Sequence, residues 1–294
     1  MYVIIRYYII SSHSHSTLSP TYQDIDSVSL QSGLSIHNQS IGVANTSNGL
    51  PRQVDGILGI GPVDLTAGAV QDTPRVPTVT DNLSSQNKIS SEIIGISFNP
   101  TTSLSPSSSS NGELTFGGVD QSKYTGSITY TPITKTSPSK YYWGIDQSVT
   151  YGSSNSGIIS MTAGIVDTGT TLVLFASDAY NRYKSLTGAT VDNRTGLLKI
   201  SSSQYSKLQS LYFNIGGTRF EFTSNAQIWP RQFSGHIGWT RILIQRRIER
   251  DRLPSFIFTF FTSDISFMHA YLFEIICCFS FSFIFSRATK LPKK

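Results

Sequence analysis

The chain has 294 residues, of which 14% are charged and 12% aromatic, and it contains two cysteines. Its formal net charge of +5 comes from residues 231–294, which hold 10 basic and 4 acidic residues, whereas residues 1–230 hold 13 and 14. Because the basic charge sits in one terminal segment, it is no sign of a nucleic-acid surface, and we predict no nucleic-acid partner. The cysteines, Cys277 and Cys278, are adjacent, which suits neither an ordinary disulfide nor a zinc site. We predict no metal and no cofactor.

The first 20 residues give little structural information. Met1 to Ser12 is apolar but short and contains Arg6, so it is not a convincing secretory signal. Ser/His repeats follow, and we expect residues 1–20 to be unstructured or non-native. Further along, Asn-x-Ser/Thr sequons occur at Asn38, Asn45, Asn82 and Asn193. They are compatible with a secreted protein, although Asn- and Ser-rich chains also generate such triplets by chance.

Residues 21–232 alternate between short apolar runs and turn residues, which indicates a mainly β protein. Turns are predicted at Gly117-Gly118 and Gly216-Gly217. Helices are predicted over 78–90 and 177–185, the second with Ser177 as its N-cap. The predicted strands cover residues 27–30, 34–36, 40–44, 54–58, 92–98, 112–116, 127–132, 142–149, 164–166, 171–175, 211–215 and 218–222.

The segment 233–294 has a different composition. Residues 241–252 are rich in Arg, and residues 255–285 are rich in Phe and Ile without turn residues. The stretch 267–285 has about the length that a membrane helix needs, but Glu274 inside it argues against a span. We therefore interpret 233–294 as a divergent tail, of the kind that a shifted reading frame produces, and keep a membrane span as the less favoured alternative.

One motif carries chemistry: Asp167-Thr168-Gly169-Thr170 occurs once, between the apolar runs 164–166 and 172–175. A carboxylate between two buried segments is costly unless the protein uses it. Gly169 lets backbone amides approach the carboxylate, and the Thr hydroxyls can brace it. Asp167 is thus the candidate catalytic residue, and Thr168, Gly169 and Thr170 form its supporting loop.

Several motifs in a fixed order resemble one family. From about Thr21 to Arg231 the chain is similar to the secreted fungal branch of the pepsin-like aspartic endopeptidases. The motifs that carry this resemblance are Val54-Asp55-Gly56-Ile57-Leu58-Gly59-Ile60-Gly61, Gly112-Glu113-Leu114-Thr115-Phe116-Gly117-Gly118, Tyr141-Tyr142-Trp143-Gly144-Ile145, Ile165-Val166-Asp167-Thr168-Gly169, Phe213-Asn214-Ile215-Gly216-Gly217 and Ala226-Gln227-Ile228-Trp229-Pro230-Arg231.

The resemblance implies a mainly β, pepsin-like fold with a remnant of the N-terminal lobe over 21–130 and a C-terminal lobe over 131–232. It implies an extracellular, monomeric aspartic endopeptidase that binds an extended peptide and attacks it with an Asp-activated water. By the same resemblance, the Thr170 hydroxyl hydrogen-bonds the neighbouring carboxylate, and Gly169 and Thr171 contact substrate. Tyr142 and Trp143 are interpreted as packing residues.

The departures from the family pattern concern the catalytic pair. Family members carry two Asp-Thr-Gly loops, and here none precedes Ile57-Leu58-Gly59. The segment after Arg231 also lacks the apolar-apolar-Gly motif that supports the second loop. We therefore expect these residues alone to be inactive, unless two copies of Asp167 meet in a homodimer. The alternatives are a non-catalytic peptide-binding protein and a non-functional gene product.

Overall fold

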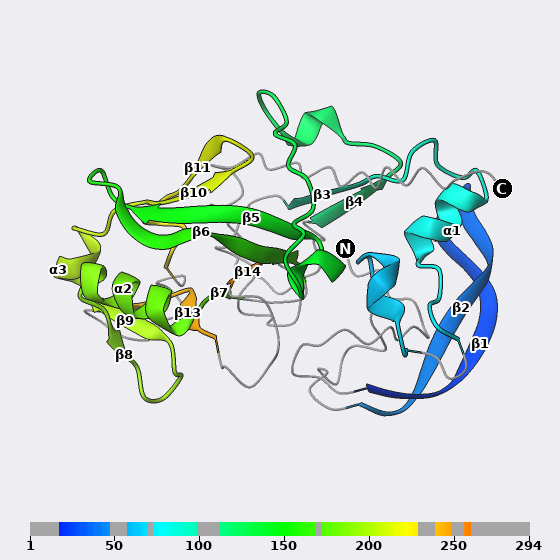
Figure 1. The fold of residues 1–294 in the computed structure, drawn as a ribbon, viewed down its shortest axis with the longest axis horizontal. Helices are drawn as coiled ribbons and strands as arrows, with labels where there is room; N and C mark the ends of the chain where they lie inside the picture. Colours follow the sequence, from blue (N-terminus) through cyan, green and yellow to red (C-terminus); the bar gives the residue numbers. More distant parts are fainter. Residues whose placement is uncertain are drawn as a thin grey trace. The chain divides into compact units, whose positions relative to one another are not determined.

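The computed structural model describes residues 18–47, 58–69, 73–98, 112–168, 172–228, 239–247 and 256–259 (Figure 1). The chain divides into two compact units. Unit 1 comprises residues 1–97, 113–128 and 282–294, and unit 2 comprises residues 98–112 and 129–281. Strands dominate both units, which confirms the mainly β prediction.

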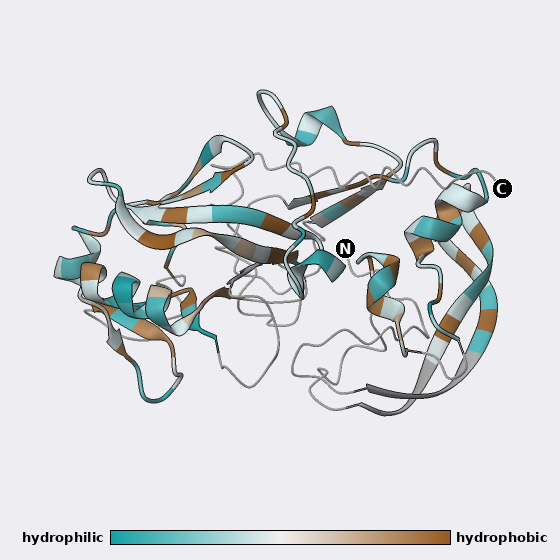
Figure 2. Cartoon of the chain, in the orientation of Figure 1, coloured by the Kyte–Doolittle hydropathy of each residue, from teal (hydrophilic) through white to brown (hydrophobic). Residues whose placement is uncertain are grey.

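Unit 1 is built on a long antiparallel hairpin, β1 (Leu18–Gln31) and β2 (Leu34–Ser47). Gly33 closes the hairpin with a φ of 81°, a conformation that costs a glycine little. Apolar residues are interspersed with polar ones along the coloured part of both strands (Figure 2), and Val28, Ile36 and Ile41 among them are buried. A second two-stranded sheet pairs β3 (Ile94–Phe98) with β4 (Gly112–Phe116).

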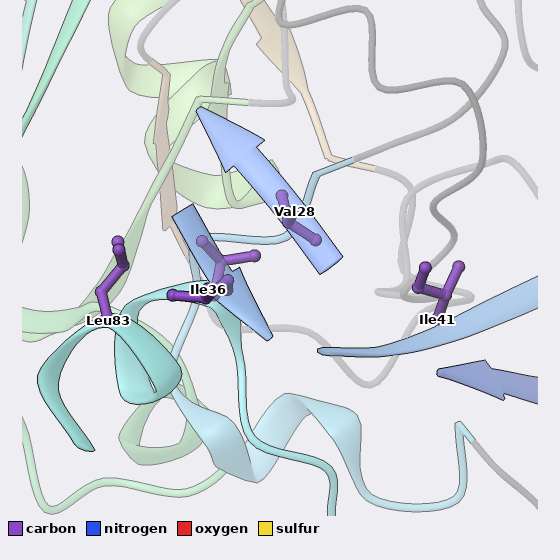
Figure 3. Close-up of a cluster of buried hydrophobic side chains, with 5 residues drawn as sticks. Val28, Ile36, Ile41 and Leu83 are labelled. Carbon is purple, nitrogen blue, oxygen red and sulfur yellow. The ribbon is translucent and has the colours of Figure 1, made fainter. Parts of the chain in front are cut away.

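The core of unit 1 forms where α1 (Val79–Ser85) packs against the hairpin. Val28, Ile36 and Ile41 of the hairpin and Val79 and Leu83 of α1 are all buried, and Figure 3 draws this cluster. The helix begins at Val79 because Thr78 and Asp81 form a capping box, in which each side chain accepts a hydrogen bond from the other residue's backbone N–H. It ends at Ser85, five residues before the predicted end.

Unit 2 contains a seven-stranded mixed sheet in the order β11-β10-β5-β6-β14-β7-β13. The hairpin β5–β6 forms its middle, and the hairpin β10–β11 turns through Gly216 and Gly217, both at positive φ as the predicted turn requires. The strands are β5 (Gly144–Tyr151), β6 (Ser156–Asp167), β7 (Val173–Phe175), β10 (Leu211–Ile215), β11 (Thr218–Phe222), β13 (Ile244–Arg246) and β14 (Phe256–Thr259).

Among the described residues, unit 2 also contains a smaller sheet, two α-helices and a short 3-10 helix, Ser139–Tyr141. The sheet has the order β12-β9-β8, with β8 (Thr190–Val191), β9 (Leu198–Ser201) and β12 (Trp239–Ile242). The α-helices are α2 (Ser177–Thr187) and the single turn α3 (Ser202–Tyr205). The predicted N-cap of α2 is wrong by one residue, because Ala176 holds that position and Ser177 is already helical. No side-chain cap replaces it, and Asp178 in the first turn faces the positive end of the helix dipole.

Two predictions on element positions differ from the structure. Residues 127–132, predicted as a strand, have no regular structure. They pass the β10–β11 turn instead, where the Thr129 and Thr218 hydroxyls are hydrogen-bonded at 3.0 Å. In the other direction, β12, β13 and β14 all lie within 233–294 and pair with β9, β7 and β6. Residues of the predicted tail therefore take part in both sheets of unit 2.

The possible membrane span at 267–285 falls outside the described residues. Within the parts of the chain that the structure does describe, no helix has the length and apolar character to cross a bilayer.

Candidate active site

Asp167 is the last residue of β6 and lies where two neighbouring strands fix its backbone. Strand β6 runs between β5 and β14, and the parallel register places Thr259 of β14 opposite Asp167. On the other side, the Val166 N–H donates a hydrogen bond of 2.9 Å to the Trp143 carbonyl oxygen. Asp167, a partly buried residue, thus stands on a paired backbone. Such pairing restricts where its carboxyl group can move.

The chain is anchored again directly after the Asp167 loop. The Val173 N–H, at the start of β7, donates a hydrogen bond of 3.2 Å to the Leu243 carbonyl oxygen, and Phe175 at the end of β7 is fully buried. Strand β14 pairs with both β6 and β7, so it ties the two ends of the loop together (Figure 1). Thr168 is partly buried, and residues 169–171 lie outside the described residues. The roles predicted for Gly169, Thr170 and Thr171 stay predictions.

Tyr142 lies beside Asp167, a proximity that the sequence interpretation missed. In the β5–β6 register Gly144 is opposite Ile165, and continuing the register by two residues brings Tyr142 level with Asp167. Burial raises the pKa of the Tyr142 phenol, and the nearby negative charge of Asp167 raises it further. The two residues are 25 positions apart in the sequence, which hides the pair. The signal that could have revealed it is that the apolar run after Tyr142 and the apolar run before Asp167 pair as antiparallel strands.

A buried hydrogen-bond network supports the far end of β7. The ring of Tyr183, from α2, meets Phe175 and Tyr151 edge-on at centroid distances of 6.2 and 6.0 Å. Its hydroxyl donates a hydrogen bond of 2.8 Å to Gln227 Oε1. Gln227 is itself fully buried, and its Nε2 donates to the carbonyl oxygens of three further residues: Gln209, Phe222 and Thr223. The motif containing Gln227 was noticed in the sequence, but its role as a buried crosslink was not.

These groups define a limited chemistry. Asp167 can accept or donate a proton, whereas the Tyr142 phenol is protonated at neutral and acidic pH, like any phenol, and its raised pKa only strengthens this. Among the residues that the structure describes, no group of three or more His, Cys, Asp and Glu side chains is arranged to hold a metal ion. Within the part of the chain that the structure describes, the site therefore offers the Asp167 carboxyl group at the end of a paired strand, with the protonated Tyr142 phenol beside it.

A mainly β chain that presents an Asp-Thr-Gly aspartate at the end of a central strand has the architecture of a pepsin-like aspartic proteinase. Comparison with known proteins agrees. The family model described as eukaryotic aspartyl protease matches residues 16–251, and the chain belongs to this family.

Individual relatives show how far the likeness extends. Polyporopepsin of Irpex lacteus is 60% identical over 215 residues, which are 72% of this chain and 62% of that protein. Rhizopuspepsin-1 of Rhizopus niveus is 35% identical over 211 residues, 70% of this chain and 49% of that protein. The chain therefore spans between about half and two thirds of the length of these relatives.

A solved structure confirms the pepsin-like fold. The crystal structure of the aspartic proteinase from Irpex lacteus matches with a TM-score of 0.73 at 46% sequence identity. The match covers 90% of this chain and 82% of that chain.

Proposed function

We propose that this chain supplies one half of an aspartic endopeptidase site, with Asp167 as its catalytic carboxyl group, and that residues 1–294 alone do not hydrolyse peptides. The observation that carries the proposal is the placement of Asp167. It stands at the end of a central strand, between two pairing strands, in the only Asp-Thr-Gly of the 294 residues. Membership of the aspartyl protease family supports the same reading.

Peptide hydrolysis by this chemistry needs two carboxyl groups a hydrogen bond apart. Two carboxylates that close cannot both ionise, so they share one proton and titrate in separate steps. The ionised member removes a proton from a water molecule, while the protonated member donates a hydrogen bond to the carbonyl oxygen under attack. Asp167 can perform either task, but it cannot perform both at once.

The expected loss of rate follows from the two tasks. General acid–base catalysis contributes about 10²–10⁴-fold, and stabilising the tetrahedral oxygen contributes about 10²–10³-fold. A chain that lacks one of them loses several powers of ten. Tyr142 does not replace the missing carboxyl group, because a phenol with a raised pKa cannot take up the proton that the water molecule releases.

We infer that the substrate class is an extended polypeptide and that the place of action is outside the cell. Membership of a peptidase family supports the first inference, and the likeness to the fungal aspartic proteinase polyporopepsin supports the second. We infer further that the chain is a monomer, as the resemblance to the family implies.

The test is a protein-digestion assay at acidic pH with the full chain and the variant Asp167→Asn. We expect both to release peptides from denatured haemoglobin at the same background rate. Cleavage that a statin-type inhibitor blocks and Asp167→Asn abolishes would overturn the proposed inactivity. Sedimentation of the active sample would then show whether a dimer had formed.

A second assay tests the assignment of Asp167 independently of turnover. Binding of a fluorescent statin-type peptide is measured with the wild-type chain, with Asp167→Asn and with the matched control Asp178→Asn. Asp178 is an exposed carboxylate in the first turn of α2. We expect wild-type and Asp178→Asn to bind alike and Asp167→Asn to bind more weakly. Equal binding by all three would remove Asp167 from the site.

A further inference from the structure

The folded structure distinguishes between two of the four glycosylation sequons, those at Asn82 and Asn193, because only an exposed asparagine can carry a glycan in a native molecule. The triplet Asn193-Arg194-Thr195 lies in the turn that joins β8 to β9, and all three residues are exposed. Among the described residues, the Asn193 side chain has no hydrogen bond or ion pair to lose.

The residue before Asn193 explains why this turn keeps its shape without using the asparagine. Asp192 is only 4% exposed. Its Oδ1 accepts a hydrogen bond from the Arg194 N–H at 3.2 Å, and its Oδ2 accepts one from the Thr195 hydroxyl at 3.0 Å. Arg241 of β12 forms an ion pair with the same carboxylate, with Nε 3.2 Å from Oδ2. The turn is thus held from inside by Asp192, and Asn193 remains at the surface.

Asn82 presents the opposite case. It lies in α1 and is partly buried, and its Nδ2 donates a hydrogen bond of 2.8 Å to Gln39 Oε1. Gln39 is 1% exposed and lies in β2. A sugar on Nδ2 replaces one of its two amide hydrogens, and its bulk beside the buried Gln39 would crowd the contact between α1 and the hairpin.

We propose that Asn193 is an acceptor of an N-linked glycan and that Asn82 is not occupied in the folded protein. In the reaction, Asn193 Nδ2 bonds to the anomeric carbon of a lipid-diphosphate-linked oligosaccharide. The bond between that carbon and the diphosphate oxygen breaks, the lipid diphosphate leaves, and one amide proton passes to a base of the transferase. No group is oxidised or reduced. The step requires that the chain enter the lumen of the secretory pathway.

A glycan at Asn193 has a physical consequence for the sheet beside it. Strand β8 is the outer strand of the sheet β12-β9-β8, and Val191 in it is 39% exposed. An open strand edge with exposed apolar side chains can pair with other chains. The glycan, attached two residues after Val191, covers this edge and hinders such pairing.

The test uses the full chain with an added secretion signal and an appended flexible tag that carries one further sequon. The chain is expressed in a eukaryotic host, and the secreted, folded fraction is treated with peptide N-glycosidase in ¹⁸O-water, which converts occupied asparagines to labelled aspartates. Mass spectrometry is expected to find the label at Asn193 and in the tag but not at Asn82. A labelled tag with unlabelled Asn193, or a labelled Asn82, would overturn the proposal.

Matched variants separate glycosylation from folding effects. Asn193→Gln and Thr195→Val are each expected to lose one glycan and so to migrate faster on a denaturing gel than the wild-type chain. Thr195→Ser is expected to migrate like the wild-type chain, because serine keeps both the sequon and the hydroxyl that Asp192 binds. Asn82→Gln should leave the mobility unchanged. A mobility for Asn193→Gln equal to that of the wild-type chain would contradict the assignment.

Discussion

Removing a single hydroxyl group tests the buried network behind β7. In Tyr183→Phe the ring keeps its edge-on contacts with Phe175 and Tyr151, and only the hydrogen bond of 2.8 Å to Gln227 Oε1 is lost. Gln227 is fully buried, so its oxygen then lacks this partner in a place that water does not reach. Leaving a buried acceptor unsatisfied costs about 1–3 kcal/mol, and we expect unit 2 to be destabilised by this amount.

Tyr180→Phe is the matched control. Tyr180 lies one turn earlier in the same helix and is 5% exposed, and among the described residues its hydroxyl makes no hydrogen bond. Removing that hydroxyl should change the free energy of unfolding by less than about 0.5 kcal/mol. The two variants thus differ in one hydrogen bond and in little else.

The assay is urea unfolding of the full chain, followed by tryptophan fluorescence. All three tryptophans, Trp143, Trp229 and Trp239, belong to unit 2 by position in the chain, so the signal reports on that unit. With a slope of about 2 kcal/mol per molar urea, the midpoint of Tyr183→Phe should fall by about 0.5–1.5 M, and that of Tyr180→Phe should hardly move. Equal midpoints for the two variants would refute the role assigned to Gln227.

Three further predictions concern other parts of the molecule. Leu83→Ala leaves a cavity at a fully buried position in unit 1 and should lower the free energy of unfolding by about 2–5 kcal/mol. Hydrogen-exchange protection of α1 should therefore fall at least about 30-fold. Unchanged protection would contradict the packing of α1 on the hairpin. Gly144→Ala places a Cβ against the Ser139 carbonyl oxygen, too close for any side chain, and should lower the urea midpoint of unit 2. Gly157→Ala has open space around it and should leave the midpoint unchanged. Burial raises the pKa of the Asp192 carboxyl group, but its hydrogen bonds and Arg241 outweigh this effect and hold the pKa below its usual value. Ionised Asp192 therefore stabilises the fold above about pH 4. This part of the free energy of unfolding should be lost as the pH falls through the lowered pKa. Asp192→Asn has no such carboxyl group, so its free energy of unfolding should lack this pH-dependent part.

Local chemistry made much of the fold predictable. The glycines at 216 and 217 predicted the β10–β11 hairpin because two successive residues at positive φ suit a tight turn. Helix α2 is predictable from its polar start, Ser177 and Asp178, although the cap is misplaced by one residue. Residues 127–132 were misassigned because their composition suits a strand while their neighbours offer only a turn to pack on.

Pairing between distant segments was not predictable in the same way. Nothing in the local sequence of 239–259 shows which strands it joins, because pairing depends on partners elsewhere in the chain. The same limit applies to the site. Asp167 was singled out because a charge between apolar runs is unusual, whereas Tyr142 looked like a packing residue until the strand register brought it level with Asp167.

The position of β14 bears on the order in which the protein can assemble. Its residues pair with residues of β6 that lie about 90 positions earlier in the chain. During synthesis, β6 and β7 emerge long before β14, which lies between them in the sheet. Until β14 is made, the edges of β6 and β7 that it will occupy have no strand paired to them. Closing so long a loop is slow, and the waiting edges are open to other chains. Strand β6, which carries Asp167, therefore leaves the ribosome well before β14. A chaperone that binds unpaired strand edges can act in the interval between the two.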